Sequence, residues 1–71
     1  MRLHYYPETD SLHIELRDEP EAETRKIAAG HNVDLNASGE VVGFDIDGAS
    51  RHLDLTTLET IARPLPTTRA A

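Results

Sequence analysis

The chain has 71 residues, with 7 basic and 13 acidic side chains, a formal net charge of −6 and no cysteine. This length allows a single small domain, and the lack of cysteine excludes disulfides and thiolate metal sites. The basic residues are scattered along an acidic chain, which disfavours nucleic-acid binding. Because neither a signal peptide nor a long apolar run is recognisable, we expect a cytoplasmic protein without membrane contacts.

Residues 2–17 predict a β-hairpin. Apolar and polar side chains alternate from Arg2 to Tyr6 and again from Ser11 to Arg17, around a turn at Pro7–Asp10. The predicted cross-strand pairs are Arg2–Glu15, Leu3–Ile14, His4–His13, Tyr5–Leu12 and Tyr6–Ser11. This register opposes apolar with apolar residues and joins opposite charges, as cross-strand energetics favour.

An acidic, proline-containing segment follows the hairpin and is predicted to be a loop. Its carboxylates are candidates for docking a basic partner: Asp18, Glu19, Glu21 and Glu23. A solvated loop without a partner explains the same composition. Thr24 to Ala28 is a weaker strand candidate.

A second hairpin is predicted from residue 31 to residue 47. His31–Asn36 and Glu40–Asp47 alternate in polarity, and Asn36–Gly39 suits a type I turn that closes on a left-handed glycine. A glycine bulge here can shift the pairing by one residue. Gly43 in mid-strand indicates a bend or a close backbone approach.

After residue 50 the period becomes helical. Leu55, Leu58 and Ile61 recur at helical spacing, and Thr56–Glu59 fits a capping box. The pattern predicts a helix of about two turns that ends at Arg63-Pro64. We therefore expect one α+β domain over residues 1–63, an antiparallel β-meander of four to five strands with one short C-terminal helix, followed by a flexible tail over residues 64–71.

The alternating apolar positions are expected to form one shared core layer. Its candidates are Leu3, Tyr5, Leu12, Ile14, Leu16, Val33, Leu35, Val42, Phe44, Ile46, Leu55, Leu58 and Ile61. Edge strands remain in so small a sheet, so homo-oligomerisation through these edges is expected. A chain of this size also leaves little room for a ligand cleft of about 300 Å³.

Two segments of the sequence resemble domain-of-unknown-function family 2283. Residues 5–16 are similar to its opening motif Y-D-x-E-x-D-x-L-Y-I-x-L, and residues 33–46 to V-D-x-D-x-x-G-x-V-V-G-I-E-I. Asp47–Arg51 stands where the family has L-x-A-S-K/R. The resemblance as a whole covers residues 2–62. The chain departs from the family at Tyr6, His13 and Asp47, where aspartate, an aromatic residue and an apolar residue are usual. The family has no established activity; the resemblance implies a fold and loosely suggests an antitoxin-like or interaction role.

Histidines offer one candidate metal site. In the predicted register His4 faces His13, and Glu15 lies on the same sheet face. Two imidazoles and a carboxylate can hold zinc or nickel, although two exposed histidines on a solvated face are the simpler interpretation. His31 and His52 are expected to be separate surface residues.

Three aspartates offer a second candidate. Asp45 and Asp47 share a strand face, and Asp34 is expected across from them. Clustered carboxylates bind hard cations or transfer protons, but alternating aspartates also mark the solvated face of a half-buried sheet.

No catalytic or cofactor-binding residue is predicted. Cysteine is absent, and no serine lies in a G-x-S-x-G motif. The leading hypothesis is a non-enzymatic protein-interaction module, antitoxin-like, with a small basic partner. The alternatives are a metal-binding protein that uses surface histidines and carboxylates, and a small oligomeric enzyme with a site between subunits.

Overall fold

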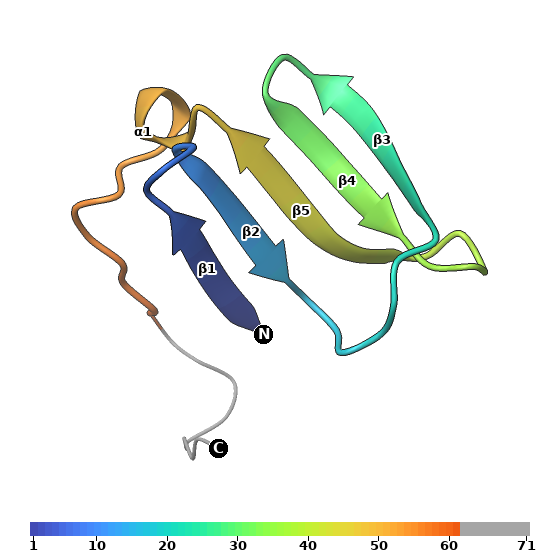
Figure 1. The fold of residues 1–71 in the computed structure, drawn as a ribbon. Coiled ribbons are helices and arrows are strands. Elements are labelled where there is room, and N and C mark those ends of the chain that lie inside the picture. The colour runs from blue at the N-terminus through green and yellow to red at the C-terminus, as the bar shows by residue number, and fades with distance from the viewer. Residues whose placement is uncertain (62–71) are drawn as a thin grey trace.

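The computed structural model describes residues 1–61 and shows one antiparallel sheet with a short helix at one corner (Figure 1). The elements in chain order are β1 (Arg2–Tyr6), β2 (Ser11–Glu15), β3 (Glu23–Ala28), β4 (His31–Leu35), β5 (Val41–Asp47) and α1 (Ala49–His52). The α+β class and its antiparallel sheet are confirmed. The predicted tail, residues 64–71, lies outside the described residues.

The order of strands across the sheet is β1-β2-β5-β4-β3. β5 therefore lies between β2 and β4, and the chain crosses from β2 to the far edge before it returns (Figure 1). All residues of the edge strands β1 and β3 are exposed, whereas β5 buries Val42, Gly43 and Ile46. The strand with an apolar middle occupies the centre because both of its edges are then paired and its side chains are flanked on two sides.

The first hairpin has the predicted register in all its pairs, from Arg2 opposite Glu15 to Tyr6 opposite Ser11. The Arg2 guanidinium donates to Glu15 across the strands at 2.7 Å. The turn between β1 and β2 ends at Asp10, whose φ of 54° is left-handed. Aspartate tolerates this conformation better than most residues.

The second turn is also as predicted. The backbone N–H of Gly39 donates to the Asn36 carbonyl at 2.9 Å, and Gly39 has a φ of 83°. The Asn36 side-chain oxygen accepts the N–H groups of Ser38 and Glu40, forming an Asx-type turn. The pairing of β4 with β5 shifts by one residue between Asp34 and Leu35.

The short helix lies earlier than the sequence indicates. α1 begins directly after β5, and Ala49 is fully buried in a cluster with Leu12 and Ile46. Asp10, far away in the sequence, holds this helix: its carboxylate accepts the N–H and hydroxyl of Ser50, and its carbonyl accepts the N–H of Ala49.

The helix predicted to carry Leu55, Leu58 and Ile61 was wrong for the part that is described, because residues 55–61 form no helix. The Asp54 carboxylate accepts hydrogen bonds from Thr56 and Thr57, so these threonines join a local turn and form no capping box. Leu58 and Ile61 remain 77% and 78% exposed. A helix of about two turns needs tertiary packing to be stable. The apolar side chains of residues 55–61 are not buried against the rest of the molecule.

The core is smaller than predicted. Buried apolar residues are Leu12, Val33, Leu35, Val42, Ile46 and Ala49. Leu3 and Tyr5 were expected inside but are 47% and 40% exposed. They line a groove of about 490 Å³ with Leu12, Ile14, Leu53, Leu55 and Leu58. The expectation of little room for a cleft of about 300 Å³ was therefore wrong, since residues 53–58 line one side of this part of the sheet without filling the groove. None of the described helical residues forms a segment that is long and apolar enough to cross a bilayer.

Candidate functional site: a buried carboxylate beside a histidine

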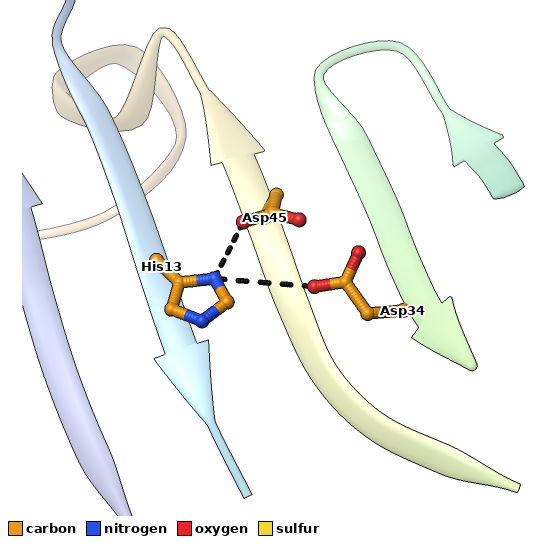
Figure 2. A group of neighbouring side chains, drawn as sticks. All are labelled: His13, Asp34 and Asp45. Atoms are coloured by element: carbon orange, nitrogen blue, oxygen red, sulfur yellow. Dashed lines mark hydrogen bonds and ion pairs between the residues drawn. The ribbon is translucent and has the colours of Figure 1, made fainter. Parts of the chain in front are cut away.

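Three ionisable side chains meet on the polar face of the sheet, one from each of its neighbouring strands β2, β4 and β5 (Figure 2). His13 lies directly opposite Asp45 in the pairing of β2 with β5. Asp34 of β4 lies opposite Gly43 of β5. Because Gly43 precedes Asp45 by two residues, Asp34 and Asp45 lie on the same face of the sheet. Strand pairing thus brings together residues that are 11 to 32 positions apart in the chain.

The three groups are close enough to act on one another. His13 Nδ1 lies 2.6 Å from Asp45 Oδ1 and 3.9 Å from Asp34 Oδ2. One ligand atom from each residue lies within 4.8 Å of the other two. The side chains of His13 and Asp45 are both 36% exposed, whereas that of Asp34 is only 1% exposed. The cluster therefore has one solvent-accessible side, formed by His13 and Asp45, and one buried side, formed by Asp34.

Asp34 is the unusual member. Its Oδ1 accepts a hydrogen bond of 2.8 Å from the Thr24 hydroxyl, but its buried Oδ2 has no hydrogen-bond partner among residues 1–61. An unpaired buried polar atom is costly, and most such atoms in native proteins are paired. Burial raises the pKa of Asp34, and the adjacent Asp45 carboxyl raises it further. Thr24 and His13 oppose this rise in pKa.

His13 is shifted in the direction that favours its charged form. Its hydrogen bond to Asp45 raises the pKa of the imidazole above its ordinary value, against the opposing effect of desolvation. The charges of Asp45, Asp34 and Glu15 act in the same direction as the hydrogen bond. The site therefore concentrates negative charge around one imidazole nitrogen.

Gly43 makes space for this arrangement. A Cβ atom at this position would lie 2.9 Å from the Ile14 carbonyl oxygen, 3.3 Å from Asp34 Oδ2 and 3.6 Å from His13 Cε1. The close backbone approach predicted at Gly43 is confirmed. A side chain there would displace the backbone of β2 or the Asp34 carboxylate.

The predicted histidine site is only partly assembled. His4 faces His13 as expected, and both line a shallow hollow of about 240 Å³ with Glu15. However, the His4 ring stacks on Tyr6 at 4.1 Å between centroids, and Glu15 pairs with Arg2. Among residues 1–61, the set able to bring three ligand atoms together is His13, Asp34 and Asp45.

Other predicted positions lie outside this cluster. Asp47 accepts a 3.4 Å hydrogen bond from Asn32 and is not among the three ligand-bearing residues. His31 and His52, expected to be separate, pack edge-to-face with ring centroids 4.7 Å apart. Their contact depends on the position of α1, which sequence patterns did not reveal.

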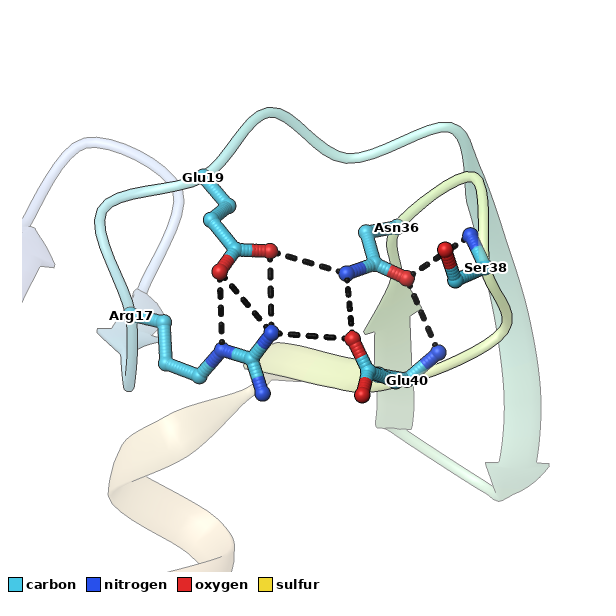
Figure 3. A network of polar contacts seen from close by, with 5 residues as sticks. All are labelled: Arg17, Glu19, Asn36, Ser38 and Glu40. Carbon is cyan, nitrogen blue, oxygen red and sulfur yellow. Dashed lines mark hydrogen bonds and ion pairs between the residues drawn. The ribbon is translucent and has the colours of Figure 1, made fainter.

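The acidic loop is tied to the rest of the molecule (Figure 3). Arg17 donates to Glu19 and to Glu40 at 2.8 and 3.0 Å, and Asn36 donates to Glu19 at 2.8 Å. Glu21 accepts from Thr24, and Glu23 pairs with Arg25. The role of Asp18, Glu19, Glu21 and Glu23 in docking a partner stays a prediction.

The sequence placed the three cluster residues in two different candidate sites. Sequence patterns group His13 with its hairpin partners, and Asp34 and Asp45 with Asp47, because alternation and turn signals reveal pairing only between strands that follow one another in the chain. The apolar middle of residues 41–46 was the available signal, since such a strand belongs at the centre of a sheet and would then contact β2 as well as β4.

One of three comparisons with known proteins gave a match. The family model described as "Protein of unknown function (DUF2283)" matches residues 2–50. This stretch contains all five strands and the beginning of α1, and it confirms the resemblance inferred from the motifs. No curated protein and no solved structure matches the chain.

Proposed function

The chain belongs to the DUF2283 family of proteins of unknown function, and we propose that it acts as a protein-interaction module for a small basic protein. The observation that carries the proposal is the open apolar groove beside the first hairpin. A sheet normally buries one face against a second layer. Here the groove of about 490 Å³ leaves apolar side chains accessible on that face.

The groove has the shape and chemistry of a docking surface. Its floor comes from β1 and β2, with Leu3, Tyr5 and Ile14, and its wall from Leu55 and Leu58. Exposed apolar groups that lie together are typical of interaction sites, whereas isolated ones are common on any surface. Burial of these groups by a partner would add a hydrophobic contribution that residues 1–61 alone do not provide.

The charge of the chain favours a basic partner over a second copy. The chain carries a net charge of −6, and three of its arginines, Arg2, Arg17 and Arg25, already pair with its own carboxylates. Two copies that met through the groove would bring like charges together, while a cationic partner would be attracted. This is the electrostatic character expected of an antitoxin-like member of a pair.

Two matched variants test the proposal. Leu58 lines the groove and is 77% exposed, whereas Ile61 is 78% exposed and does not line it. Leu58→Ser and Ile61→Ser therefore remove similar exposed apolar side chains without disturbing the core. We expect the tagged wild-type chain and Ile61→Ser to capture the same small basic protein from the native host, and Leu58→Ser to lose it. Salt should weaken the complex, because its electrostatic part is screened.

Two results would contradict this proposal. Equal capture by all three chains would show that the groove is not the binding surface. A homodimer that Leu58→Ser dissociates, measured by light scattering, would show that a second copy covers the groove.

A further inference from the structure

The Asp34 carboxylate lacks a structural explanation within its own surroundings. It is 1% exposed, and in the described part of the chain Oδ2 has no hydrogen-bond partner, although Oδ1 accepts a hydrogen bond from Thr24. The unpartnered atom points into the cluster, toward His13 Nδ1 at 3.9 Å (Figure 2). Leaving a carboxylate oxygen buried without a hydrogen bond is unfavourable, so a cation bound directly to Oδ2 would satisfy it.

We propose that His13, Asp34 and Asp45 form a binding site for a divalent transition-metal ion of the zinc type. Each residue contributes one atom: Nδ1 of His13, Oδ2 of Asp34 and Oδ1 of Asp45. The ion supplies the direct partner that Oδ2 lacks, since His13 Nδ1 lies 3.9 Å away, beyond hydrogen-bond distance. It takes the place of the proton that now lies between His13 Nδ1 and Asp45 Oδ1, and that proton passes to solvent.

The geometry needs only small movements to accept such an ion. Zinc binds imidazole nitrogen and carboxylate oxygen at about 2.0–2.2 Å, so tetrahedral ligand atoms lie about 3.4 Å apart. The distances from His13 Nδ1, 2.6 Å to Asp45 and 3.9 Å to Asp34, fall on either side of this value. His13 and Asp45 are 36% exposed and can adjust, while Asp34 is fixed by burial and by Thr24.

The mixture of donors selects the class of ion. An imidazole nitrogen with two carboxylates suits zinc and its neighbours in the first transition row, whereas calcium and magnesium prefer oxygen alone. Because the exposed side of the cluster faces solvent, a fourth position stays open for water. Three protein ligands with one open position is the arrangement of zinc sites that exchange a ligand, in contrast to closed structural sites.

Zinc titration of the full chain tests the proposal. After removal of metals with a chelator, we expect zinc to raise the melting temperature by roughly 10–20 °C at a hundredfold excess over the dissociation constant, and magnesium or calcium to have no such effect. Asp34→Asn, which keeps the side-chain shape, should bind zinc at least about tenfold more weakly. Circular dichroism checks that this variant is folded.

Control variants separate this site from its rivals. Asp47→Asn removes a carboxylate from the same strand face, and His4→Gln removes the imidazole opposite His13; both should bind zinc as the wild type does. The double variant His31→Gln, His52→Gln removes the other histidine pair and should also retain binding.

A measurement on the unaltered chain gives a second, independent result. In long-range ¹H–¹⁵N spectra of the imidazoles, zinc should change the His13 Nδ1 signal and leave the other three histidines unaffected. A wild type whose melting temperature does not respond to zinc, or an Asp34→Asn chain that binds zinc equally well, would overturn the proposal. Loss of binding in His4→Gln, or a response at His31 and His52 without one at His13, would also overturn it.

Discussion

Single atoms decide how tightly the central strands approach one another. At Gly43, the absent Cβ is what allows the Ile14 carbonyl of β2 and the Asp34 carboxylate of β4 to lie so close to β5. Gly43 is not among the residues with positive φ. Its role is therefore to leave space, and its backbone conformation is open to other residues.

Gly43→Ala tests this explanation through the sign of its effect. If the space were free, alanine would stabilise the chain by restricting the unfolded state. Because Cβ would lie 2.9 Å from a backbone oxygen, we expect instead a loss of about 1–3 kcal/mol in the free energy of unfolding, measured by urea denaturation. An increase in stability would show that the strands move apart easily.

Asp10 is a second residue with an effect beyond its neighbours. Its carboxylate accepts hydrogen bonds from Tyr5 and Ser50, and these hydrogen bonds, with Ser50 contributing most, lower its pKa below the ordinary value of 3.8. A group with a lowered pKa in the folded state contributes stability above its unfolded pKa and loses it as the pH falls through the folded value. The loss of the stability that Asp10 contributes should therefore appear at acidic pH.

Asp10→Asn isolates this contribution. Asparagine tolerates the φ of 54° but carries no charge. We expect the stability difference between wild type and variant, from denaturant unfolding at several pH values, to be constant at neutral pH and to shrink below about pH 4. A difference that stays constant down to pH 2 would show that the Asp10 charge does not matter.

Among the elements, α1 shows how tertiary contacts select between local candidates. The stripe of Leu55, Leu58 and Ile61 is a better helical pattern than residues 49–52, yet the helix forms at the latter. Ala49 is fully buried, and Asp10 supplies hydrogen bonds to the first turn. The stripe is not buried, since Leu58 and Ile61 are 77% and 78% exposed, and Asp54 binds the threonines that would have capped it.

Proline substitution distinguishes the two segments. In a helix interior proline costs about 3 kcal/mol. Since residue 59 lies in irregular structure, we expect Glu59→Pro to change the free energy of unfolding by less than about 0.5 kcal/mol. Arg51→Pro is the control, because it removes the N–H that donates to the Gly48 carbonyl at 2.9 Å. A large loss in Glu59→Pro alone would place a helix there.

For the whole molecule, the open question is what pairs with the two sheet edges. β1 and β3 form these edges and are exposed along their length. β3 carries Glu23, Arg25 and Lys26, and charged side chains discourage edge pairing. β1 carries Arg2 as its one such charged side chain, and homo-oligomerisation through this edge remains a prediction.

Light scattering over a range of concentrations measures this association. We expect the mass to rise from one chain toward two as concentration increases, and a Leu58→Ser chain to behave as the wild type does, because residue 58 lies outside the edge strands. A mass of one chain at every concentration would contradict edge pairing.

Sequence patterns were sufficient wherever the decisive contacts lie close along the chain. The complete register of the first hairpin and the Asn36–Gly39 turn followed from alternation and turn chemistry, and the motifs identified the family. The hairpin and the turn depend on residues at most 13 positions apart, whose preferences agree with one another.

The three-dimensional arrangement settled what depends on distant contacts. The insertion of β5 beside β2, the meeting of His13 with Asp34 and Asp45, and the support of α1 by Asp10 each join residues separated by 21 to 40 positions. Many pairings of five strands satisfy the same local patterns. The observed one is selected by burial of the apolar middle of β5 from both sides, a property of the whole sheet that no single segment carries.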